Sequence, residues 1–78
     1  MIRVLDKISY LEVNANSTIV AGQITGETGN SLQIKFIRKN NCSWIPKIEI
    51  KSSYDNKNFS TQFFEISDWV LIQEGLLI

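Results

Sequence analysis

The side chains best suited to binding chemistry in this chain are the cations and aromatic rings that gather between residues 35 and 57. Lysine and arginine neutralise phosphates, and an exposed aromatic ring beside them stacks on a base, so such a group is typical of a nucleic-acid contact. An indole platform also fits a proline-rich peptide. The candidate partner-binding residues are therefore Lys35, Arg38, Lys39, Trp44, Lys47, Lys51, Tyr54 and Lys57.

Catalytic and metal chemistry have few residues to use in this sequence. The chain has no histidine and one cysteine, Cys42, which removes the commonest metal ligand, the usual proton shuttle and any internal disulfide. Its carboxylates show no spacing that demonstrates an acid–base pair. Because no histidine can activate it, Cys42 is predicted to be a buried structural residue of a strand. We expect a non-enzymatic protein that binds no metal.

Three glycines, Gly22, Gly26 and Gly29, do not form a phosphate-binding loop. No Gly-Lys-Ser or Gly-Lys-Thr step follows them, and no helix is predicted after Gly29. Gly22 is predicted to mark a bulge or a close backbone approach inside a strand, and the other two are predicted to form a turn. We therefore expect no cofactor.

The formal net charge is zero, from eight basic and eight acidic residues. This balance lacks the overall positive field that draws many proteins onto nucleic acid or anionic membranes, and it agrees with a protein partner. The charges are nevertheless segregated, because residues 35–57 hold six cations and two acidic residues, whereas the chain after residue 57 holds three acidic residues and no cation. Two interpretations stay open: the two parts neutralise each other in the fold, or the basic part is a binding patch.

Seventy-eight residues suffice for one hydrophobic core, so residues 1–78 are predicted to form a single domain. Alternating and β-branched apolar residues predict strands at residues 2–13, 18–25, 31–38, 42–45 and 61–66, the first of them in a central position of the sheet. Residues 52–60 are the longest expected loop. Pro46 lacks a backbone donor and must lie at an edge or at a strand end.

A helix of about two turns is predicted after the last strand. Ser67 suits the N-cap, Asp68 suits the positive end of the helix dipole, and Gly75 is a natural stop. The residues expected to face the sheet are Trp69, Ile72 and Leu76. At least one of the two tryptophans, Trp44 and Trp69, is predicted to lie in the core, and Tyr54 is predicted to be exposed in its polar loop.

Two resemblances involve the region around Pro46. The aliphatic-Pro step that leads into a short turn at residues 44–50 is similar to the corresponding step of SH3-like barrels. The segments Trp44-Ile45-Pro46-Lys47-Ile48-Glu49-Ile50, Ile66-Ser67-Asp68-Trp69 and Gly75-Leu76 together resemble small uncharacterised proteins of phages and bacteria, which usually carry serine where this chain has Ile48. That resemblance implies a C-terminal strand and a Trp-containing helix, and it implies no activity.

The sequence as a whole predicts a mainly β fold, a small SH3-like (or OB-like) barrel of about five strands with one short C-terminal helix. We expect a non-catalytic binding module that docks on a protein partner or complex, as an accessory or inhibitor protein of phage or mobile-element type. One alternative is single-stranded nucleic-acid binding through residues 35–57. Another is capture of a small nucleotide in a pocket shared between subunits.

The remaining expectations concern partners and location. The apolar tail Leu76-Leu77-Ile78 is a candidate homodimer contact, and the strand edge beside Pro46 is a second candidate surface. No apolar run approaches the roughly 18 residues that span a bilayer, and charges interrupt the N-terminal apolar residues. A cytoplasmic protein without a membrane partner is expected.

Overall fold

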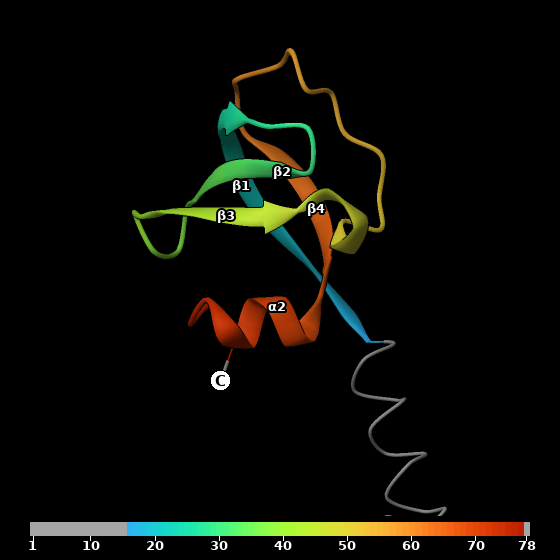
Figure 1. The fold of residues 1–78 in the computed structure, drawn as a ribbon. Helices are drawn as coiled ribbons and strands as arrows, with labels where there is room; N and C mark the ends of the chain where they lie inside the picture. The colour runs from blue at the N-terminus through green and yellow to red at the C-terminus, as the bar shows by residue number, and fades with distance from the viewer. Residues whose placement is uncertain (1–15, 78) are drawn as a thin grey trace, which may run out of the picture.

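The computed structural model describes residues 16–77 (Figure 1). The elements, in chain order, are β1 (Ser17–Glu27), β2 (Ser31–Phe36), β3 (Cys42–Pro46), the short 3₁₀ helix η1 (Lys47–Glu49), β4 (Gln62–Ser67) and helix α2 (Asp68–Gln73). Four of the predicted strands and the predicted helix are present. The strand predicted at residues 2–13 lies outside the described residues.

The four strands form one antiparallel sheet in the order β3-β2-β1-β4. Within residues 16–77, β3 is an edge strand, and Pro46 is its last residue, as the missing backbone donor of proline requires. The sheet is open among residues 16–77, so these residues do not form the expected barrel of about five strands. The mainly β architecture with one short helix is confirmed.

The core lies between one face of this sheet and helix α2, which runs across that face (Figure 1). Successive side chains of a strand point to opposite faces, and β2 shows this alternation as predicted, with Leu32, Ile34 and Phe36 buried and Lys35 exposed. Among residues 16–77, the buried apolar residues are Ile24, Leu32, Ile34, Phe36, Ile45, Ile50, Phe64, Ile66, Val70 and Leu71.

Helix α2 presents a different side to the core from the one predicted. Val70 and Leu71 are buried, whereas Trp69 and Ile72, which were expected to face the sheet, are exposed. The helix has only six residues, fewer than two turns, so its apolar spacing does not define one face. The direction in which the chain leaves β4 at Ser67 decides which residues point inward.

Gly75 ends the helical segment as predicted and directs the chain back onto the core. Its φ of 76° lies in the left-handed region, which favours glycine. The Leu76 N–H donates to the Leu71 carbonyl oxygen at 2.7 Å, and the Gly75 N–H donates to the Ile72 carbonyl oxygen at 3.0 Å, which is the Schellman pattern. Leu76 therefore packs against the core as expected, and Leu77 packs beside it.

β2 separates from β1 halfway along the longer strand. β1 has eleven residues and β2 has six, and their pairing begins at Gly22 and Phe36. Beyond Phe36 the chain turns, because the Lys39 and Asn40 N–H groups both donate to the Phe36 carbonyl oxygen and Asn40 adopts a φ of 54°. The first half of β1 thus pairs with β4 on one side and with no strand of residues 16–77 on the other.

Candidate functional site

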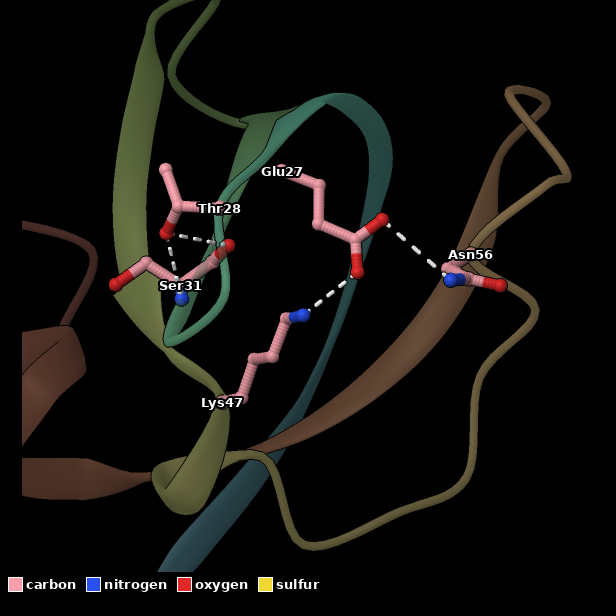
Figure 2. Close-up of polar contacts among 5 residues, drawn as sticks. All are labelled: Glu27, Thr28, Ser31, Lys47 and Asn56. Carbon is pink, nitrogen blue, oxygen red and sulfur yellow. Dashed lines mark hydrogen bonds and ion pairs between the residues drawn. The ribbon is translucent and has the colours of Figure 1, made fainter.

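Two of the predicted site residues, Lys47 and Lys51, lie beside carboxylates. The Lys47 ammonium is 2.6 Å from Glu27 Oε2 (Figure 2), and the hydrogen bond from Lys47 is the main reason that the pKa of Glu27 is lower than its ordinary 4.5. The Asn56 amide contacts the other Glu27 oxygen at 3.4 Å. Lys51 Nζ is 3.8 Å from Glu49 Oε1. Both lysines therefore have part of their charge neutralised within the domain.

Lys35 and Trp44 lie on the face of the sheet opposite α2. Lys35 pairs with Cys42 across β2 and β3, and Trp44 pairs with Gln33 on the same face. Trp44 is 48% exposed, and Cys42 is exposed as well. The prediction of a buried structural cysteine is wrong, because no second layer of residues 16–77 covers this face of the edge strand.

Tyr54 and Lys57 belong to the segment between η1 and β4. Tyr54 was predicted to be exposed, but it is half-buried and packs on the core residue Phe64, with their ring centroids 6.1 Å apart. Lys57 is exposed. The segment is held in place because the Gln62 amide donates to the carbonyl oxygens of Asp55 and Asn58 at 2.9 Å. Tyr54 is therefore a packing residue rather than an open stacking platform.

Neither tryptophan lies in the core, contrary to the prediction for at least one of them. Trp69 is 37% exposed, and its indole N–H donates to Glu49 Oε1 at 3.3 Å. The fully buried Ser67 hydroxyl donates to the same oxygen at 2.6 Å. Ser67 occupies the N-cap position as predicted, but its hydroxyl bonds this carboxylate and makes no side-chain cap of α2. Glu49 thereby ties η1 to the start of the helix.

The Glu49 contacts predict an acid dependence of stability. The hydrogen bond from the Ser67 hydroxyl is the main cause that sets the Glu49 pKa below 4.5, and Trp69 and Lys51 lower it further, whereas burial of the carboxylate acts in the opposite direction. A lowered folded-state pKa stabilises the fold above about pH 4.5, and that contribution is lost as the pH falls through the folded-state value. We expect Glu49→Gln to cost about 1 kcal/mol at pH 7 and to weaken the decline in unfolding free energy between pH 5 and pH 3.

Urea denaturation at a series of pH values measures this effect. Glu74→Gln is the matched control, because it removes one carboxylate that forms no side-chain hydrogen bond or ion pair with residues 16–77. Its pH profile should stay closer to that of the original protein than the Glu49→Gln profile does. Equal profiles for the two variants would contradict the role given to Glu49.

The remaining pair of predicted residues, Arg38 and Lys39, borders a groove that sequence reasoning missed. Its hollow, of about 190 Å³, lies beside the first half of β1. Val20 and Phe36 form its walls together with Leu76 and Leu77, which the Gly75 turn brings to this place. The sequence predicted a strand as far as residue 38, whereas the chain turns beyond Phe36, which makes β2 shorter than β1.

Two aliphatic residues that contribute to the lining of the hollow have exposed side chains. Ile19 is 67% exposed and Ile37 is 60% exposed, and both line the hollow. Large aliphatic side chains that remain in water beside an apolar hollow are typical of an interaction site. Lys39 Nζ donates to the Glu74 carbonyl oxygen at 3.3 Å, near the end of α2. Arg38 lines both this hollow and the adjoining one, which Gly75 also lines, and no salt bridge joins it to an acidic residue of 16–77.

The structure thus divides the eight predicted residues instead of joining them in one patch. Arg38 and Lys39 lie at the groove, and Lys35 and Trp44 lie on the outer face of the sheet. Lys47 directly follows the last residue of β3, at the end of that strand away from Cys42. Lys47 is five positions along the chain from Cys42, which corresponds to roughly 16 Å at the usual rise per residue. The basic segment is therefore spread over the surface.

Comparisons of the chain with protein-family models, with curated proteins and with solved structures found no match. The resemblance to small phage and bacterial proteins accordingly stays a prediction. In the part of the chain that the structure describes, no three metal-ligating side chains lie together. No helix there has the length and apolar character to cross a membrane. The geometry of the groove is the remaining guide to function.

Proposed function

We propose that this domain is a non-catalytic binding module that docks on a protein partner through the groove beside β1. One observation carries the proposal: an apolar hollow of about 190 Å³ lies open beside Ile19 and Ile37, two large aliphatic residues that are mostly exposed. Burial of such surface is the main favourable term in protein association, at roughly 25 cal/mol per Å². The accessory or inhibitor role of a phage or mobile-element protein belongs to this proposal.

A pair of isoleucine variants tests the docking site. Ile37→Glu places a charge at the groove, whereas Ile48→Glu makes the same change on η1, where the side chain is 80% exposed. Both positions are on the surface, so each variant should retain its unfolding free energy within about 0.5 kcal/mol. We expect the original chain and the Ile48→Glu variant to retain the same partner protein. The amount retained by Ile37→Glu should be lower by about tenfold or more.

The measurement is quantitative mass spectrometry of proteins retained by the tagged chain in cells that make it naturally. Circular dichroism of each purified variant checks the fold. Equal retention by the two variants would contradict docking at this groove. Nucleic acid retained without protein would contradict docking on a protein altogether.

Single-stranded nucleic-acid binding remains the second candidate, and one observation favours it. Lys35 and the half-exposed Trp44 lie on the same face of neighbouring strands, where a base could stack while a phosphate meets the ammonium group. Binding of this kind weakens steeply as salt rises, whereas an apolar protein interface responds weakly. The salt dependence of any complex therefore separates the two candidates.

Several finer expectations also stay proposals. The homodimer contact was assigned to the apolar tail, of which Leu76 and Leu77 pack partly against the core and Ile78 lies outside the described residues. A partner molecule would therefore meet only the part of these leucines that remains at the groove. A fifth strand and closure into an SH3-like barrel, the shared nucleotide pocket and the cytoplasmic location likewise remain expectations from the sequence.

A further inference from the structure

We infer that the groove binds an extended segment of the partner protein as an added strand on the first half of β1. This inference rests on the proposed docking function and specifies its chemistry. The segment carries an aliphatic side chain that enters the hollow and an acidic side chain that reaches Arg38. The observations behind it are a strand edge without a partner among residues 16–77, an apolar hollow under that edge and a cation at one end.

This strand edge is defined by the hydrogen bonds of β1. The Ala21 carbonyl oxygen accepts from the Ile37 N–H at 3.3 Å, so the backbone groups of Ala21 point away from β4 and toward β2. Backbone groups alternate in direction along a strand, so those of Ile19 point to the same side as those of Ala21. The β2 chain has already turned away there, and Ile19 meets no backbone partner from residues 16–77 on that side.

The opposite side of the same segment is fully paired. β4 pairs with every residue of β1 from Ser17 to Gly22, through its own residues from Ser67 to Gln62. The first half of β1 is therefore held by β4 on one side, and on the other side its backbone groups have no partner strand among residues 16–77. Such an edge adds a strand readily, because main-chain hydrogen bonds supply affinity and pockets for alternate side chains supply specificity.

The hollow lies where an added strand would direct its side chains. Val20 points to the core side of β1, and it lines the hollow together with Phe36 and Leu76. Residues that face each other across paired strands project to the same side of the sheet, so the added residue opposite Val20 projects into this hollow. The lining is largely apolar, which selects an aliphatic side chain of moderate size.

The charges at the groove indicate which type of residue lies next to the aliphatic residue in the partner segment. Arg38 lines both the main hollow and the adjoining one, and Lys39 lines the second. No Asp or Glu of residues 16–77 lines either hollow. A partner segment with a carboxylate next to its aliphatic residue therefore complements the groove, and a basic segment does not.

The test uses synthetic peptides and the full 78-residue chain. The probe is a fluorescein-labelled hexapeptide of sequence TVLVEE, and its binding is followed by fluorescence anisotropy. Two further peptides carry N-methyl groups, one at the second and fourth residues and the other at the third and fifth. Because backbone N–H groups alternate in direction, only one of these sets faces β1. We expect one methylated peptide to lose about tenfold or more in affinity and the other to bind like the parent.

Charge reversal provides the second arm of the test. Arg38→Glu should weaken TVLVEE about fivefold, and the peptide TVLVKK should recover affinity for that variant. Lys57→Glu is the matched control, because it also reverses one exposed charge but Lys57 lines neither hollow, so both affinities should stay unchanged. Equal effects of the Arg38 and Lys57 variants would overturn the assignment of the acidic residue.

The other outcomes also decide the matter. Equal binding of both methylated peptides, or no saturable binding by the parent, would overturn strand addition while leaving docking at the groove to the Ile37 test. Hydrogen exchange of the Ile19 amide in the protein without peptide shows whether another segment already pairs with this edge of β1. Protection that is independent of protein concentration would assign the edge to residues 1–15, and protection that rises with concentration would assign it to a second copy. Either result would overturn the inference.

Discussion

Phe64→Ala is expected to destabilise the domain by about 3–5 kcal/mol, the largest effect of any single substitution considered. Phe64 lies in β4 with no exposed surface, and it packs in the core with Tyr54 against its ring. Alanine removes most of the side chain and leaves a cavity that the sheet can only partly close. Typical domains unfold at a cost of about 5–15 kcal/mol, so the variant should lose most of its margin of stability.

The neighbouring residue supplies the matched control for this prediction. Phe63 precedes Phe64 in the same strand, faces the opposite side of the sheet and is 68% exposed. Phe63→Ala removes the same atoms and should change the unfolding free energy by about 0.5 kcal/mol or less. Urea denaturation followed by tryptophan fluorescence measures both variants. Similar losses for the two would contradict the assignment of the core face of β4.

Gly22→Ala is expected to cost about 1–3 kcal/mol through overpacking. Gly22 lies in β1 opposite Phe36, and a Cβ atom there would be 2.6 Å from Ile34 Cγ2 and 3.1 Å from the Lys35 carbonyl oxygen. Ile34 is fully buried and its β-branched side chain has few rotamers, so it cannot move aside cheaply. The two central strands would have to separate slightly to accept the methyl group.

Gly29→Ala is the control for this substitution, since no atom outside its chain neighbours lies within 4 Å of the position of the added Cβ. We expect that variant to be neutral or more stable by up to about 1 kcal/mol, because alanine restricts the unfolded chain. The difference in melting temperature between the two glycine variants is the measurement. A Gly22→Ala variant as stable as Gly29→Ala would contradict the close packing of β1 against β2.

The strands could be predicted from the sequence because their signals are local. Alternation of Leu32, Ile34 and Phe36 with polar residues defines the inner face of β2 without reference to any other element. The close approach predicted at Gly22 is confirmed, whereas the bulge lies between Ile24 and Gly26. Ser67 and Gly75 likewise mark the limits of the helical segment through local backbone chemistry.

The burial of several side chains could not be predicted, because it depends on which elements lie above them. Cys42 and Trp44 have apolar character, but they point to the face of the sheet that α2 does not cover. Trp69 has the largest side chain of its helix, yet the exit of the chain from β4 turns Val70 and Leu71 inward instead. Such outcomes depend on long-range packing.

The groove could not be predicted from the sequence, because it also depends on long-range packing. Its walls come from β1, from the turn after β2 and from the chain beyond Gly75, which are far apart in the sequence. The cations Arg38 and Lys39 were identified as site residues, but nothing in their spacing associates them with Leu76 or Val20. The sequence therefore identified part of the candidate site without its apolar centre.

Photocrosslinking from single positions in the cell tests directly whether the groove beside β1 contacts a partner protein. The photoreactive residue benzoylphenylalanine replaces Ile37 in the lining of the groove or, in the control, Ile48 on η1. Both side chains are exposed, so the two residues differ in location rather than in access to solvent. We expect a discrete protein adduct from position 37 and none from position 48. An adduct from position 48 alone, or the absence of a protein adduct from position 37, would contradict this contact.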